Sequence, residues 1–99
     1  MIHLRSFRPS DWQIITKYQH ADMMQADAVK LIDEFNAPTY GNKFQKLLAI
    51  ADNEQIVGYV SLIEQNDGIV SIGVEVYAPS RRQGYAYAGI SQLLIMANA

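Results

Sequence analysis

The sequence contains no cysteine, and its only two histidines, His3 and His20, stand apart. Disulfides and thiolate metal sites are therefore excluded, and we expect no metal centre. No apolar run is long enough to cross a bilayer, and residues 1–12 lack the apolar segment of a secretory signal. The net charge is only −2, which argues against general nucleic-acid binding. We expect a soluble, cytoplasmic protein that binds neither nucleic acid nor a membrane.

What the chain does contain is enough apolar material for one core. It has 99 residues, and 49% of them are hydrophobic, which excludes a disordered chain. No linker, repeat or low-complexity stretch divides it, so we expect a single domain over residues 1–99.

Residues 68–99 read as a strand, a short loop and a helix. Apolar and polar residues alternate over residues 69–77, which predicts a strand that Pro79 ends. One face of this strand carries Val70, Ile72, Val74 and Val76. From Gly84 the apolar residues recur at helical spacing. The predicted buried stripe of this helix comprises Ala86, Ile90, Leu93, Leu94 and Ala97.

The loop between this strand and helix has the features of an anion site. A helix that begins just after a glycine presents free backbone N–H groups at the positive end of its dipole, where a phosphate fits. Gly84 leaves room for close approach, and Arg81 and Arg82 add charge and donors. An ordinary strand-to-helix turn with solvated arginines is the alternative.

The hexapeptide from Arg81 to Ala86, RRQGYA, resembles the R/Q-x-x-G-x-G/A signature of the GNAT superfamily of N-acetyltransferases. The preceding stretch, IVGYVSLIEQNDGIVSIGVEVYAPS, is similar to the antiparallel strand pair that leads into that loop in the family. The resemblance implies that loop amides hold the coenzyme A pyrophosphate, and that amides of the preceding strand bond the acetyl carbonyl and the pantetheine arm. The implied cofactor-binding residues are Val74, Val76, Arg81, Arg82, Gln83, Gly84, Tyr85 and Ala86.

The rest of the chain fits an α/β (mixed α+β) fold. Strands are predicted over residues 2–7, 46–51 and 56–63, with a turn at Asn66-Asp67-Gly68, and Gly58 marks a bulge or a close contact. A first helix starts near Ser10, which is predicted to cap it, and a second lies within residues 20–37. Residues 38–44 are predicted to form a loop. The expected order is β-α-α-β-β-β-α, a mostly antiparallel sheet flanked by helices, as in the N-terminal part of the GNAT fold.

An acetyltransferase must also move a proton from the amine acceptor. Glu75 is the only carboxylate on the strand before the loop, so it is the candidate general base, although a solvated strand residue is the reading we favour. The resemblance makes Met23, Met24 and Tyr40 candidates for acceptor contact; core methionines and an exposed loop tyrosine are the alternative. Tyr85 and Tyr87 lie on the cofactor helix and are not expected to protonate the leaving thiolate.

The resemblance implies acetyl-CoA as cosubstrate and a primary amine as acceptor, in a direct transfer without a covalent intermediate. In the family the sheet continues after the cofactor helix, whereas this chain ends at Ala99, so we expect an incomplete GNAT domain, truncated before the C-terminal strands. A naturally short chain and two chains that complete each other are the alternatives to truncation. An exposed strand edge could then pair two copies in a homodimer. Two other functions stay open: a non-catalytic GNAT-like CoA-binding or dimerisation module, and, more weakly, a nucleotide- or phosphate-binding α/β protein.

Overall fold

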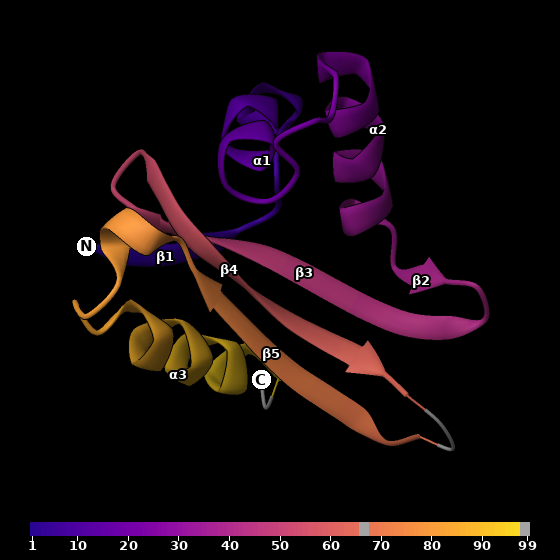
Figure 1. Ribbon diagram of the computed structural model, residues 1–99. Coiled ribbons are helices and arrows are strands. Elements are labelled where there is room, and N and C mark those ends of the chain that lie inside the picture. The colour runs from indigo at the N-terminus through magenta and orange to yellow at the C-terminus, as the bar shows by residue number, and fades with distance from the viewer. Residues whose placement is uncertain (66–67, 98–99) are drawn as a thin grey trace.

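The computed structural model describes residues 1–65 and 68–97, which form an antiparallel sheet with helices on both faces (Figure 1). The strands are β1 (Ile2–Arg5), β2 (Thr39–Tyr40), β3 (Lys43–Asp52), β4 (Gln55–Glu64) and β5 (Val70–Val76). The helices are α1 (Trp12–Tyr18), α2 (Gln25–Asn36) and α3 (Tyr85–Ala97), with short 3-10 helices at Pro9–Asp11 and Ala78–Ser80. The expected mixed α+β fold with an antiparallel sheet is confirmed.

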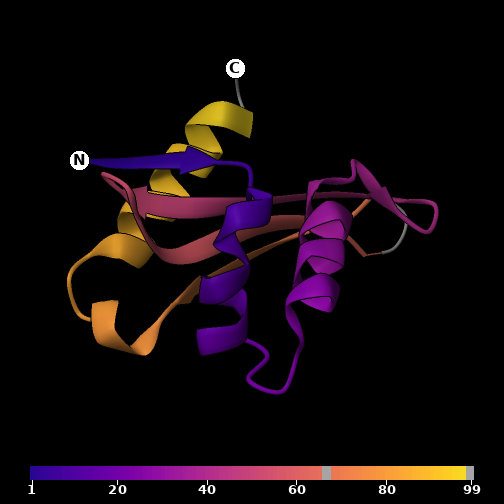
Figure 2. The ribbon, with the colours of Figure 1, turned by 90° about the horizontal axis from the view of Figure 1, so that it is seen from above.

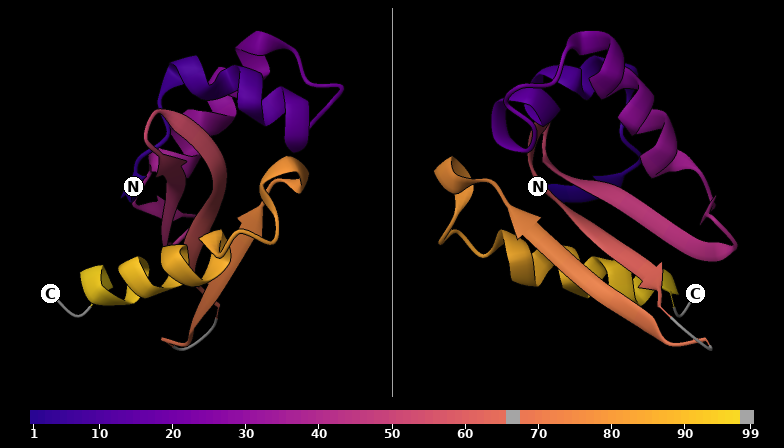
Figure 3. Two further views of the ribbon diagram at one scale, coloured as in Figure 1. Left: turned by 90° about the vertical axis from the view of Figure 1, so that its left-hand side faces the viewer. Right: turned by 45° about the vertical axis from the view of Figure 1, so that its right-hand side comes forward.

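The main strands lie in the order β1-β3-β4-β5, and each pairs antiparallel with its neighbour. Within the described residues β5 pairs with β4 alone, so it forms one edge of the sheet, the orange strand of Figure 3. The short β2 pairs only with the start of β3. The predicted Asn66-Asp67-Gly68 turn includes residues 66–67, which lie outside the described residues.

The sheet separates two apolar clusters. Helices α1 and α2 cover one face and α3 covers the other (Figures 1 and 2). The cluster on the α1–α2 face is built from the buried residues Phe7, Ile15, Ala28, Ile32, Ala49, Ala51, Ile56 and Tyr77. The cluster on the α3 face is built from the buried residues Leu48, Ile50, Val57, Val60 and Leu93. Apolar side chains on both faces of β3 and β4 are expected of a sheet covered on both sides.

Gly58 allows β5 to approach β4 unusually closely, which confirms the expectation of a bulge or close contact. A Cβ at this position would lie 2.0 Å from the backbone oxygen of Glu75 and 2.9 Å from the Cα of Val76. The register of β3 and β4 also shifts nearby, between Ile50 and Ala51. Gly58 therefore helps set the position of the end of β5, where the predicted site begins.

Several sequence predictions of local structure are wrong. Strand β1 ends at Arg5 rather than at residue 7, and β3 begins at Lys43, because its start pairs with β2 in the segment predicted to be a loop. Ser10 does not cap the first helix. Helix α1 begins at Trp12, and the Asp11 carboxylate accepts hydrogen bonds from the Arg8 N–H (2.7 Å) and the Arg5 guanidinium (2.8 and 3.0 Å).

The buried stripe of α3 also differs from the prediction. Leu93 is buried and Ile90 is half-buried as expected, but Ala86, Leu94 and Ala97 are exposed. The other buried residue is Gly89, where an added Cβ would lie 2.7 Å from Cδ1 of Ile50. A glycine carries no apolar side chain, so the sequence pattern did not mark the place where the helix lies closest to the sheet.

Candidate functional site

The free edge of β5 presents a defined set of backbone groups. The Tyr77 N–H donates to the Val57 carbonyl (2.9 Å) at one end of the strand pair, and the Gln65 N–H donates to the Ile69 carbonyl (2.7 Å) at the other. In an antiparallel pair the residues bonded to the neighbour alternate with residues whose N–H and C=O point away. The backbone groups of Val74 and Val76 therefore point to the free edge, as the bond from Arg81 Nε to the Val76 carbonyl (2.8 Å) also shows.

The loop after β5 reaches α3 through two residues in the left-handed region. Arg82 has φ +68° and Gly84 has φ +82°. Nothing lies within 4 Å of an ideal Cβ at Gly84, so its backbone angle, and not a lack of space, favours glycine there. The Ala88 N–H donates to the Gly84 carbonyl (3.1 Å), which places Gly84 at the cap position directly before α3. The N–H groups of the first helical turn have no partner within the helix and are available to a ligand.

An open pocket of about 590 Å³ joins the end of β5, the loop and the start of α3. Its lining residues are Val74, Glu75, Val76, Ser80, Arg81, Arg82, Gly84, Tyr85, Ala86 and Tyr87. Seven of the eight residues predicted to bind the cofactor are in this lining. The eighth, Gln83, is exposed and does not line the pocket.

The pocket carries two guanidinium groups and one carboxylate. Arg81 Nη2 lies 3.3 Å from Glu75 Oε1, and both side chains are about half exposed, at 58% and 47%. Such a solvated ion pair contributes little to stability. Because Arg82 adds a second positive charge, the lining has an excess of positive charge that suits an anionic ligand.

Two tyrosines lie beside Glu75 on the face of the sheet that α1 and α2 cover. Tyr59 pairs with Glu75 across the strands, and Tyr77 follows it along the chain. Burial and the charge of Glu75 raise the pKa of Tyr59, and burial raises the pKa of Tyr77 to about 12. The Gln19 amide donates to the Tyr77 hydroxyl (2.5 Å), and the Tyr18 ring stacks on Tyr77 at 4.8 Å.

Sequence reasoning missed these tyrosines as neighbours of the site. The strand alternation did place Tyr77 on the same face as Glu75, and that signal could have found it. The position of Tyr59 next to Glu75 depends on the register between β4 and β5, and the pattern of one strand does not predict that register.

Tyr85 fixes the start of α3 to the β3–β4 turn. Its hydroxyl donates to Asp52 Oδ2 at 2.6 Å. This hydrogen bond lowers the pKa of the Asp52 carboxyl and raises the pKa of Tyr85. The Tyr85 proton is thus held by Asp52, away from any group in the pocket.

The two methionines suggested as acceptor contacts, Met23 and Met24, do not gather at the pocket. Met23 is half-buried against the cluster on the α1–α2 face, while Met24, at the start of α2, is 72% exposed. Tyr40 falls in β2. Neither methionine lines the pocket at the end of β5.

Comparison with known proteins gives no match to a family model and none to a curated protein. Among residues 1–65 and 68–97, no helix combines the length and apolar character needed to cross a membrane. The same residues contain no group of three or more His, Cys, Asp or Glu side chains placed to hold a metal ion.

Proposed function

We propose that this chain binds acetyl-CoA and transfers its acetyl group to a primary amine, as a member of the GNAT superfamily. The observation that carries the proposal is the pocket at the end of β5. It combines outward-facing strand amides, a helix N-terminus and two arginines, and its lining includes seven of the residues that the GNAT motif implies.

Three parts of acetyl-CoA meet matching groups in this arrangement. The pyrophosphate accepts hydrogen bonds from the first-turn amides of α3, near the Arg81 and Arg82 guanidinium groups. The pantetheine arm runs along the free edge of β5, where its amides pair with the outward backbone groups of Val76 and Val74. The acetyl carbonyl then lies near the Val74 N–H.

The chemistry needs little beyond this placement. The neutral amine attacks the thioester carbonyl, and the Val74 N–H stabilises the oxygen anion that forms. The carbon–sulfur bond then breaks, so that the coenzyme leaves as a thiolate and takes up the proton that the new amide nitrogen releases. Glu75 takes the proton that the ammonium acceptor loses, directly or through a water molecule. The acidic balance of the chain suits a cationic acceptor.

Calorimetric titration with acetyl-CoA tests the binding step. We expect saturable binding by the wild-type chain and binding weakened at least about tenfold in the Arg81→Ala/Arg82→Ala variant, because it loses two charge-assisted contacts. Lys30→Ala, on the exposed side of α2, removes a positive charge far from the pocket and serves as the control. No binding by the folded wild type, or equal affinity in the double variant, would refute the proposed site.

Glu75→Gln tests the catalytic step once an amine acceptor has been found by screening. If Glu75 accepts the proton, the variant loses rate and the pH dependence of the rate changes. An unchanged rate and profile would remove Glu75 from the mechanism.

A non-catalytic CoA-binding or dimerisation module is the second candidate. The observation that favours it is the ion pair of Glu75, the one carboxylate in the described pocket lining, with Arg81. In this ion pair the carboxylate is engaged with Arg81 rather than with an acceptor amine. This function predicts acetyl-CoA binding without turnover of any amine.

A further inference from the structure

The outer edge of β5 has the properties of an edge that can pair with a further strand. The alternation that turns Val74 outward also turns the N–H and C=O groups of Val70 and Ile72 outward. The side chains of these three residues are 45%, 46% and 40% exposed in chain order, and all three are β-branched. Natural sheets guard such edges with lysine, proline or a covering element. Strand β5 contains neither lysine nor proline.

The sequence of β5 is also complementary to itself. An antiparallel pairing centred on Gly73 aligns all seven residues of the strand with a second copy. Ile72 then lies opposite Val74 of the second copy and Val70 opposite Val76, which are favourable cross-strand pairs. Gly73 faces Gly73 of the second copy where the Cα atoms approach to about 4.5 Å, so that no side chains crowd there. Glu75 faces Ser71 of the second copy, so that no like charges oppose each other.

We infer that a second copy of this chain pairs with the free edge of β5 in the register centred on Gly73, forming one continuous sheet across the dimer. Because the two-fold axis is perpendicular to the sheet, both copies place their α3 helices on the same face of that sheet. The Arg81 side chain occupies one side of the Val76 carbonyl, so the central pairs contribute most.

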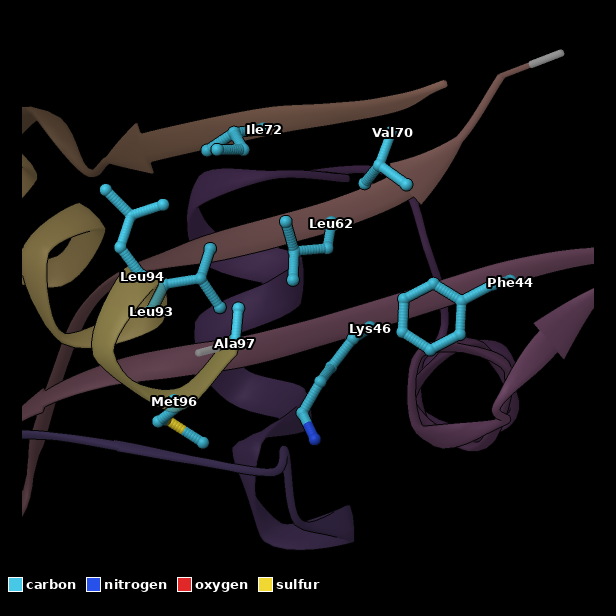
Figure 4. Close-up of a pocket in the computed structure, with 9 residues that line it drawn as sticks. All are labelled: Phe44, Lys46, Leu62, Val70, Ile72, Leu93, Leu94, Met96 and Ala97. Carbon is cyan, nitrogen blue, oxygen red and sulfur yellow. The ribbon is translucent and has the colours of Figure 1, made fainter. Parts of the chain in front are cut away.

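An apolar groove beside the edge favours the same arrangement. It has a volume of about 530 Å³ and lies between the C-terminal half of α3 and the exposed face of β3, β4 and β5 (Figure 4). Val70 and Ile72 form its margin on β5, and Leu94 and Met96 face it from α3. Pairing brings the exposed Val74 and the half-buried Val76 side chains of the second copy next to this margin and extends the apolar floor.

Pairing and cofactor binding should exclude one another, an inference that rests on the proposed function. Both use the outward backbone groups of Val74, since the strand of a second copy and the pantetheine arm would occupy the same edge. Acetyl-CoA is therefore expected to dissociate the dimer, and dimerisation to weaken acetyl-CoA binding.

Sedimentation equilibrium over a wide range of protein concentration tests the pairing without any ligand. We expect a monomer–dimer equilibrium whose dissociation constant rises at least tenfold in Ile72→Pro, because proline removes a donor that points away from β4 and leaves the β4 ladder intact. If that variant fails to fold by circular dichroism, Ile72→Lys at the same exposed position gives the equivalent result. A wild-type monomer at every concentration, or a folded variant that dimerises as tightly, would overturn the inference.

Ser71→Lys tests the register. It places an ammonium group opposite Glu75 of the second copy, so this register predicts a tighter dimer. In any register that does not place Glu75 opposite it, a lysine on the edge strand hinders pairing. A weaker dimer would therefore refute this register.

Titration with acetyl-CoA separates this inference from the proposed function. A shift of the wild type toward monomer supports the exclusion, and a dimer that binds acetyl-CoA unchanged refutes it. If the monomeric Ile72→Pro variant does not bind acetyl-CoA, the proposed function fails while the pairing stands.

Discussion

Gly58→Ala should destabilise the protein strongly, because the obstacle to an added methyl group is backbone. The new Cβ would lie 2.0 Å from the Glu75 backbone oxygen and 3.0 Å from the Glu75 carbonyl carbon. No rotamer change relieves such a contact, so β5 must move away from β4. Overpacking of a close-packed site costs about 3 kcal/mol at the upper end of its usual range.

Part of this cost is offset in the unfolded chain. Replacing glycine by alanine restricts the unfolded state and stabilises the fold by about 0.4–1 kcal/mol. The net expectation is a loss of about 2 kcal/mol or slightly more, which in a domain of this size lowers the Tm by roughly 8–16 °C.

The matched control is Gly73→Ala, on the strand that pairs with β4. The added Cβ there would lie 2.6 Å from the Ser61 hydroxyl oxygen, the end of a side chain that can rotate away. We expect a change within about 1 kcal/mol at that position. Thermal unfolding by circular dichroism at low protein concentration measures both variants. A Tm for Gly58→Ala equal to that of the wild type or of Gly73→Ala would refute the argument that Gly58 permits the close approach of β5.

Two further predictions concern pH. The pKa of Asp11 is lower than its ordinary value: burial acts to raise it, but the hydrogen bonds from Arg5 and the Arg8 N–H outweigh burial. The stability that Asp11 contributes is therefore fully present above the unfolded pKa of about 4 and is lost as pH falls through the folded pKa. Asp11→Asn is therefore expected to cost about 2 kcal/mol at neutral pH and to flatten the acid limb of a Tm–pH curve, and an unchanged acid limb would contradict this. Burial raises the pKa of Tyr77 to about 12, so its contribution is present below the unfolded pKa of about 10 and is lost as pH rises toward 12. Tyr77→Phe should remove the tyrosine that titrates near pH 12 in an ultraviolet absorbance titration, and loss of a lower-titrating tyrosine instead would count against this assignment.

The sequence predicted those features that depend on the spacing of neighbouring residues. The alternation over residues 69–77 and the change of period at Gly84 correctly indicated β5, the loop and α3. Seven predicted binding residues line one pocket, because a strand, a short loop and a helix in succession bring them together regardless of the rest of the fold. The interpretation of Gly58 succeeded for a similar reason, since glycine within an apolar strand has few structural uses.

Features that depend on distant pairs could not be predicted in this way. The hydrogen bond from Tyr85 to Asp52 and the contact of Gly89 with Ile50 join segments whose positions are set by the packing of α3 on the sheet. The same is true of Asp11, whose partners Arg5 and Arg8 displaced the predicted cap at Ser10. The pattern Ser-x-x-Gln favours a helix that begins at Ser10, but the bidentate contact of the Arg5 guanidinium with Asp11 favours the start that the structure has.

The edge of β5 connects the two proposals. An edge strand must find partners for its outward backbone groups in solvent, in a ligand or in another strand. The Arg81 side chain satisfies only the Val76 carbonyl. The N–H of Val74, on which the proposed acetyl transfer depends, is also the donor that a second copy would use. Protection of the Val74 amide from hydrogen exchange should therefore increase with protein concentration, and it should also increase with acetyl-CoA. The protection with both together should be no greater than the larger of the two separate increases.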